Sequence, residues 1–180
     1  MADKLLFIVG GPNGAGKTTA AMEFLGSSSN VYEYNGADLI AAEISPLTPA
    51  AAKVEAGREF LRRTQTCFVE GRSCLLESTL SGKSLRRTVE TAQTLGYRIE
   101  LRFLFIDSVE LSRSRVRQRA AKGGHDVPDA DINRRFCRTF RNFWGLYRQL
   151  ADYWVIYYNA LGAAKNVAFG TPQYEFVVHH

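Results

Sequence analysis

The sequence has 180 residues, with 23 Lys and Arg against 18 Asp and Glu, which gives a formal net charge of +5. This length fits one compact domain, and a composition of 46% hydrophobic and 23% charged residues argues against intrinsic disorder. No apolar run reaches the roughly 18 residues that a membrane helix needs. The apolar run at residues 5–9 is too short for a secretory signal. We therefore expect a protein that does not enter a membrane.

The three cysteines, Cys67, Cys74 and Cys137, form no Cys-x-x-Cys pair. An odd number without metal-ligand spacing is typical of reduced thiols in the cytoplasm rather than of disulfides or a zinc site. We therefore expect a cytoplasmic protein. Its basic excess suits a nucleic acid, a membrane surface or a small phosphorylated ligand equally well, so the position of the charges must decide.

In the first half of the chain, short apolar runs alternate with stretches of helical spacing. The elements expected here are a strand at residues 5–9, a helix at 17–26, a strand at 31–35, a helix at 37–44 and a long helix from 50 to about 71. Pro46 and Pro49 punctuate the loop before the long helix. The residues expected on the buried face of that helix are Ala50, Val54, Gly57, Leu61, Thr64 and Phe68.

The second half continues the alternation. The elements expected here are strands at 73–78, 97–106 and 153–158, a helix at 85–95 that stops at Gly96, a helix capped by Ser108 that stops at Gly123 and Gly124, a helix that opens after Val127, and a hairpin of 167–169 with 176–178. The apolar face expected on the helix after Val127 is Ile132, Phe136, Phe140, Phe143, Tyr147 and Leu150. Strands that alternate with helices predict an α/β fold with a five-stranded, mostly parallel sheet flanked by helices.

Residues 11–18 match the phosphate-loop pattern Gly-x-x-x-x-Gly-Lys-Thr in full, between a predicted buried strand and a predicted helix. Glycines there let backbone N–H groups and the helix N-terminus face an anion. Lys17 supplies a charge for the β- and γ-phosphates of ATP, and the Thr18 hydroxyl is a ligand for Mg²⁺. The residues expected to bind the nucleotide are Gly11, Pro12, Asn13, Gly14, Ala15, Gly16, Lys17, Thr18 and Thr19.

Other motifs narrow the class of nucleotide-binding protein. The chain has no Asn-Lys-x-Asp for guanine, and residues 80–83 only approximate the signature of a transporter ATPase. A small-molecule kinase with an arginine-rich lid remains. We expect residues 1–180 to form one P-loop kinase domain, with a lid at about 108–141 and a hairpin or tail at about 160–180.

Two acidic residues follow predicted strands, at the edge of a parallel sheet where ligands bind. Asp38 is a candidate for the base that accepts a proton from the acceptor hydroxyl, and the alternative is a helix-capping role. Glu77 ends the third strand, beside Ser78 and Thr79. It is a candidate to hold an acceptor hydroxyl or a Mg²⁺-bound water, and the alternative is a buried structural carboxylate.

Arginines gather on both sides of residues 123–128, which suits a hinged lid between two basic helices. The guanidinium group meets two phosphate oxygens at once and stabilises a phosphoryl group in transfer. Arg115 and Arg119, spaced four apart on one helix face, are the candidates. The other arginines fit solvated surface charges, and His125 fits either a lid contact or a turn residue. The full set of arginines on the two sides of residues 123–128, lid candidates included, is Arg113, Arg115, Arg117, Arg119, Arg134, Arg135, Arg138 and Arg141.

Four blocks in order resemble the zeta-toxin-like P-loop kinases, and most of all their short chromosomal members. They are residues 10–19 (GGPNGAGKTT), 35–40 (NGADLI), 77–82 (ESTLSG) and 123–128 (GGHDVP). The resemblance implies a five-stranded kinase-type sheet, ATP with Mg²⁺, and phosphate transfer to a hydroxyl, which in the toxins proper belongs to UDP-N-acetylglucosamine. It implies an antitoxin protein as a further partner.

The resemblance also assigns roles to single residues. It implies that Lys17 and Thr18 hold ATP and the metal and that Asp38 is the base. It implies that Glu77 and Thr79 contact the acceptor, and that Arg115 and Arg119 belong to the lid.

We therefore expect an ATP-dependent phosphotransferase that acts on a hydroxyl of a small metabolite, with nucleotide sugars among the candidates. A nucleic-acid partner is less favoured. The alternative is a nucleotide-dependent binding or regulatory module whose basic helices hold nucleic acid or a protein. A polynucleotide 5′-kinase lies between the two and requires a basic channel that leads to Asp38.

Overall fold

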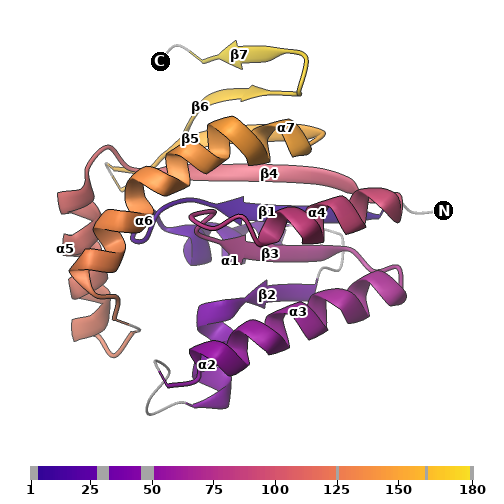
Figure 1. Cartoon of the computed structure of the whole chain (residues 1–180). Helices are drawn as coiled ribbons and strands as arrows, with labels where there is room; N and C mark the ends of the chain where they lie inside the picture. Colours follow the sequence, from indigo (N-terminus) through magenta and orange to yellow (C-terminus); the bar gives the residue numbers. More distant parts are fainter. Residues whose placement is uncertain (1–3, 28–32, 46–50, 125, 161, 179–180) are drawn as a thin grey trace.

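The computed structural model describes residues 4–27, 33–45, 51–124, 126–160 and 162–178. Over these residues the strands form one seven-stranded sheet in the order β2-β3-β1-β4-β5-β6-β7 (Figure 1). The strands are β1 (Leu5–Gly10), β2 (Glu33–Gly36), β3 (Cys74–Ser78), β4 (Arg98–Phe105), β5 (Tyr153–Tyr158), β6 (Lys165–Gly170) and β7 (Glu175–Val177). Strands β1 to β5 pair in parallel, and β6 and β7 pair antiparallel.

Helices cover both faces of the sheet (Figure 1). They are α1 (Lys17–Ser27), α2 (Ala37–Ile44), α3 (Lys53–Val69), α4 (Leu85–Thr94), α5 (Val109–Ala121), α6 (Asp129–Asn142), the π-helix η1 (Phe143–Tyr147) and α7 (Arg148–Leu150). Helices α3, α4 and α6 lie on one face, while α2 and α5 lie near the edge where β1 to β4 end. Residues that follow these strands are therefore brought together at this edge.

The central strand β1 is buried along its whole length, because its alternate side chains enter a core on each face of the sheet. On one face Leu6 and Ile8 join the core that also contains Phe143 and Trp154. On the other face Phe7 packs in parallel on Phe24 of α1, with 4.0 Å between ring centroids. Two packed faces hold the loop after β1 in a fixed position.

The expected α/β fold and its five parallel strands are confirmed, and so is the capping role of Ser108, whose hydroxyl accepts from the Leu111 N–H at 3.1 Å. The expected C-terminal hairpin is present as β6 and β7, but it pairs with β5 and so extends the expected five-stranded sheet to seven strands. The helix after Val127 was expected to run unbroken to Leu150, but it widens into η1. Neither difference changes the apolar positions on which these two predictions were based.

The buried face expected for α3 is wrong in part. Thr64 and Phe68 are buried, but the side chains of Val54 and Leu61 are 69% and 56% exposed. A row of small residues makes the contact instead, with Ala56 on α3 packed against α2. Small residues let the two helices approach closely, and the larger apolar ones turn toward the cavity described below.

Some expectations fall outside the described residues. They are the start of the second strand at residues 31–32, the loop with Pro46 and Pro49, and His125. Within the described helices, none is both long and apolar enough to cross a membrane.

Candidate active site

The phosphate loop connects β1 to α1, as its sequence predicts. At Gly11 the backbone has a φ of +149°, and a Cβ there would lie 2.1 Å from the carbonyl oxygen of Leu104. At Gly16 the φ is +87°, and a Cβ would lie 2.6 Å from Asn159 Nδ2. Only glycine fits both positions, so the loop keeps its N–H groups clear for an anion.

Lys17 is buried in this loop, with 7% of its surface exposed, and its Nζ donates to the carbonyl of Pro12 at 3.0 Å. Burial lowers the pKa of Lys17, while the nearby carboxylates of Glu77 and Asp38 oppose the shift. An ammonium group with so little water around it gains most from an anionic ligand. The expected position of Lys17 facing phosphates is consistent with this environment.

Thr18, Glu77 and Tyr34 form a hydrogen-bonded group beside the loop. Thr18 Oγ1 lies 3.1 and 2.9 Å from the two carboxylate oxygens of Glu77 and donates to them. The Tyr34 hydroxyl donates to Glu77 Oε2 at 2.6 Å. Of the alternatives for Glu77, this geometry favours a role next to Thr18, the residue expected to bind Mg²⁺. Tyr34 was not identified from the sequence, because nothing in its local pattern separates it from a core tyrosine.

The donor set of Thr18 and Glu77 fits Mg²⁺, which prefers hard oxygen ligands and takes others from phosphates and water. A magnesium ion held in this way needs only one or two protein side chains. Elsewhere among the described residues, no group of three or more His, Cys, Asp and Glu side chains could hold a metal ion.

A cavity of about 550 Å³, here called the central cavity, opens next to the phosphate loop. The candidate residues that line it are Asn13, Lys17, Asp38, Glu77, Thr79 and Arg119. Asp38 lies in the first turn of α2, and its carboxylate is 4.0 Å from Arg119 on α5. The N-cap of α2 is Gly36, with no side-chain capping bond, so the structure does not use Asp38 as an N-cap.

Arg115 does not line the central cavity. Its Nη1 donates to the carbonyls of Gly14 and Asn159 at 3.2 and 2.7 Å, and its Nη2 donates to the carbonyl of Ala160 at 3.0 Å. From the same helix, Ser112 Oγ donates to the carbonyl of Asn13 at 2.7 Å. The expected pair of lid arginines is therefore divided, with Arg119 in the cavity and Arg115 behind the phosphate loop.

Side chains of α6 and η1 hold the loop that follows β3. Thr139 Oγ1 donates to the carbonyl of Thr79 at 2.7 Å, Asn142 Nδ2 to that of Leu80 at 2.8 Å, and the Tyr147 hydroxyl to that of Gly82 at 2.7 Å. Leu80 has a φ of +55°, which is rare for a residue with a side chain. Of these three donors, the sequence analysis placed only Tyr147 on the apolar face of the helix, and it did not identify Thr139 or Asn142. Together they stabilise the strained loop at the cavity wall.

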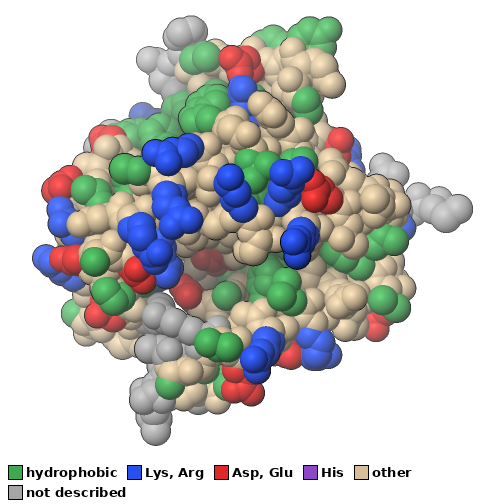
Figure 2. All heavy atoms as spheres, viewed as in Figure 1, with side chains coloured by type: hydrophobic (Ala, Val, Ile, Leu, Met, Phe, Trp, Pro, Cys, Tyr) green, Lys and Arg blue, Asp and Glu red, His purple; other side chains and the backbone are tan. Residues whose placement is uncertain are grey.

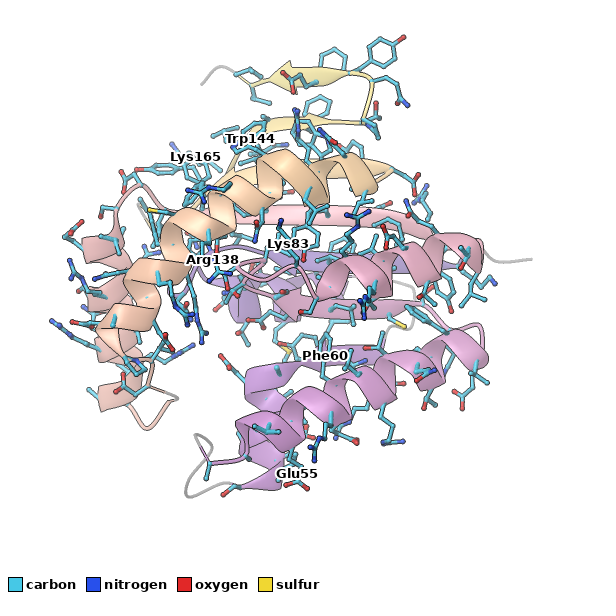
Figure 3. All side chains as sticks on the ribbon, viewed as in Figure 1. Glu55, Phe60, Lys83, Arg138, Trp144 and Lys165 are labelled. Atoms are coloured by element: carbon cyan, nitrogen blue, oxygen red, sulfur yellow. The ribbon has the colours of Figure 1, made fainter. Side chains whose placement is uncertain are left out.

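A basic face borders the cavity. Figure 2 shows a row of Lys and Arg side chains above a hollow with acidic side chains in its depth. Figure 3 places Arg138 on α6 and Lys83 just before α4 on this face. Lys83 and Arg138 are exposed and have no ion pair with any residue that the structure describes. The same is true of Arg141, which follows Arg138 by three residues on α6 and so lies on the same side of that helix.

Comparisons with known proteins agree with this fold. A curated protein of Haemophilus influenzae, itself uncharacterised, is 29% identical over 136 residues, which is 76% of this chain and 94% of that protein. The PezAT chromosomal toxin-antitoxin system of Streptococcus pneumoniae has a TM-score of 0.68 at 17% identity, over 97% of this chain and 72% of that one.

Two further structures share the fold. The AvrRxo1-ORF1:-ORF2 complex with ATP has a TM-score of 0.71 at 17% identity, over 97% of this chain and 60% of that one. Shikimate kinase from Acinetobacter baumannii has a TM-score of 0.50 at 18% identity, over 84% of this chain and 82% of that one. Toxin and kinase neighbours confirm, at the level of the fold, the resemblance to zeta-toxin-like P-loop kinases.

The family model AAA_33, described as an AAA domain, matches residues 6–136. These residues contain the phosphate loop, Asp38, Glu77 and both candidate arginines of α5. The chain, with its P-loop kinase-like fold, therefore belongs to the AAA_33 family.

Proposed function

We propose that the protein transfers the γ-phosphate of ATP to a hydroxyl group of a small metabolite. The observation that carries this proposal is the central cavity, in which a buried lysine, two carboxylates and three arginines surround one space next to the phosphate loop. Binding of the ATP phosphates requires Lys17. An enzyme that only hydrolyses ATP would not need a second space lined by Asp38. That space suits an acceptor placed against the terminal phosphate.

Each residue then has a defined part in the reaction. The Asp38 carboxylate accepts the proton of the acceptor hydroxyl, whose oxygen forms a bond to the γ-phosphorus as the bond to the β–γ bridging oxygen of ATP breaks. Lys17 and Arg119 stabilise the negative charge of the phosphoryl group. Arg115 holds the carbonyl side of the phosphate loop, so that its N–H groups face the nucleotide.

Thr18 and Glu77 would hold Mg²⁺ directly or through water, and the ion would neutralise phosphate charge when bound. The hydrogen bond from Tyr34 fixes the Glu77 carboxylate for this task. The resemblance to zeta-toxin-like kinases supports an acceptor that is a nucleotide sugar. The toxin-antitoxin system and the two-protein complex among the structural neighbours support an antitoxin partner. Both are part of the proposal.

Incubation of the purified protein with γ-labelled ATP, Mg²⁺ and a metabolite extract tests the function directly. We expect label in one class of hydroxylated compound, and no label with Lys17→Ala. Release of labelled phosphate alone, with no labelled compound in any extract, would overturn the proposal.

The basic face favours a second candidate, a polynucleotide 5′-kinase. Cations without a carboxylate partner on a face beside the cavity suit the phosphates of a strand whose 5′-hydroxyl reaches Asp38. In this case an RNA or DNA oligonucleotide with a 5′-hydroxyl becomes labelled, and its binding weakens steeply with salt. An Arg138→Gln, Arg141→Gln variant would lose this activity and would keep transfer to a small metabolite.

A further inference from the structure

The central cavity has an apolar wall that the proposed chemistry does not explain. Val54 and Leu61 lie on α3 and line the cavity with Gly57 between them. Their side chains are 69% and 56% exposed, although both are large and apolar. Phosphates, a metal ion and a reacting hydroxyl make no use of such a wall.

The spacing of these residues makes a shallow slot. Positions 54, 57 and 61 are three and four residues apart, so they share one side of the helix. A Cβ on Gly57 would have no atom within 4 Å, so space is open above the helix at that point. Phe60, which also lines the cavity, lies on the side of α3 that faces the sheet (Figure 3). The slot therefore has apolar sides and a floor of helix backbone.

The occupant of the slot is argued from the other end of the same cavity. Lys17, Asp38 and Glu77 line the space that Val54 and Leu61 also line. The cavity therefore offers a phosphate acceptor at Asp38 a continuous path toward α3. Ligand cavities typically combine a few polar groups that orient the ligand with apolar surface that supplies affinity.

We propose that the α3 slot of Val54, Gly57 and Leu61 binds a flat, apolar ring carried by the phosphate acceptor. This rests on the proposed function and deepens it, because it names the class of acceptor: a hydroxyl compound with an aromatic or heteroaromatic ring, rather than an open-chain polyol or a simple sugar. The ring lies against the helix backbone at Gly57, between the two aliphatic side chains.

Two synthetic probes isolate the ring. Phenyl β-riboside and methyl β-riboside carry the same sugar hydroxyls and differ only in the flat apolar group. Their binding is measured by calorimetry to the whole protein, saturated with Mg²⁺ and a non-hydrolysable ATP analogue. We expect the phenyl compound to bind roughly tenfold more tightly, as burial of an aromatic group predicts.

Variants of the slot test its position. Val54→Ser with Leu61→Ser, and separately Gly57→Leu, should remove the tenfold preference and leave binding of the methyl compound and of the ATP analogue unchanged. Val69→Ser is the matched control, because Val69 is on the same helix and is 84% exposed but does not line the cavity. Thermal unfolding shows that each variant is folded.

The outcomes are distinct. Equal binding of the two ribosides, no measurable binding of the phenyl compound, or a preference that survives both slot variants would overturn the slot. Because binding is measured without transfer, these results do not depend on catalysis. Failure of the proposed function would instead be detected in the assay with γ-labelled ATP and a metabolite extract, as the absence of any labelled compound.

Discussion

The hydroxyl group of Tyr34 on β2 donates to the carboxylate of Glu77 on β3 over 2.6 Å, and the same carboxylate accepts from Thr18 at the start of α1. Burial raises the pKa of Tyr34 well above its usual range, and the charge of Glu77 raises it further. The phenol is therefore protonated, and remains a hydrogen-bond donor, at neutral pH. One carboxylate is held from two elements, which fixes it beside the phosphate loop.

Tyr34→Phe removes one of these two donors and keeps the ring. We expect the Mg²⁺ concentration that half-saturates ATP binding to rise about tenfold, since a hydrogen bond to a charged group contributes about 1.5–3 kcal/mol. ATP binding measured at stepped Mg²⁺ concentrations checks this. Tyr153→Phe is the control, because Tyr153 is partly exposed on β5 and its hydroxyl group makes no hydrogen bond with any described residue. An unchanged Mg²⁺ requirement in Tyr34→Phe would separate Glu77 from the metal.

Lys17→Met replaces a buried ammonium group with an apolar side chain of similar length. We expect ATP binding to be lost and the stability of the nucleotide-free protein to be kept or raised, because burial disfavours the charged form of Lys17. Melting curves with and without ATP measure both effects. A variant that ATP still stabilises, or one that melts far below the wild type, contradicts this account of Lys17.

Asp38→Asn keeps the size of the side chain and removes its capacity to accept a proton. We expect ATP affinity to be retained and the transfer rate to fall about 10²- to 10⁴-fold, the usual contribution of a positioned base. Glu55→Gln on α3 is the matched control, because Glu55 is exposed and does not line the cavity (Figure 3). Wild-type turnover by the Asn variant would remove Asp38 from the mechanism.

Thr139→Val keeps the shape of a fully buried side chain but leaves the carbonyl of Thr79 without its donor. We expect a loss of about 1–3 kcal/mol in the free energy of unfolding, because a buried carbonyl without a partner retains its desolvation penalty. Urea unfolding gives the value. Thr91→Val should change little, since the exposed Thr91 hydroxyl donates to a carbonyl of its own helix.

Gly57→Ala should increase the free energy of unfolding by about 0.5–1 kcal/mol, because glycine destabilises the interior of a helix by that amount and the added methyl group meets open space. Gly16→Ala should have the opposite effect, since the backbone there has a φ of +87° and a Cβ would meet Asn159. Thermal or urea unfolding compares the two. Destabilisation by Gly57→Ala would show that the space above α3 is not open.

Much of this architecture could be predicted from the sequence. The apolar run of β1 and the phosphate loop after it define a strand, a loop and a helix by local pattern alone. Asp38 and Glu77 could be placed near each other because Asp38 follows β2 and Glu77 is at the end of β3, and neighbouring parallel strands end at the same edge of a sheet. A residue's position can be predicted from the sequence when it depends only on the end of the parallel strand to which the residue belongs.

Positions that depend on contacts between distant segments of the chain could not be predicted from the sequence. The apolar residues Val54 and Leu61 fit a buried helix face by spacing, but spacing cannot tell a core from a cavity wall. The division of Arg115 from Arg119 depends on the carbonyls of residues 159 and 160, which are distant in sequence. The donors of α6 that hold the loop after β3 are separated from it by about 60 residues, as for Thr139 and Thr79.

The hairpin of β6 and β7 has a consequence for how the molecule behaves in solution. It covers the outer edge of β5 and keeps Trp154 at 1% exposure, with the indole N–H donating to the carbonyl of Thr171 at 3.3 Å. Truncation before Lys165 would make β5 an exposed edge strand, whose unpaired backbone N–H and C=O groups could pair with a strand of another molecule. Such a truncation would be noticed first as self-association and precipitation, while the phosphate loop at the centre of the sheet stayed intact.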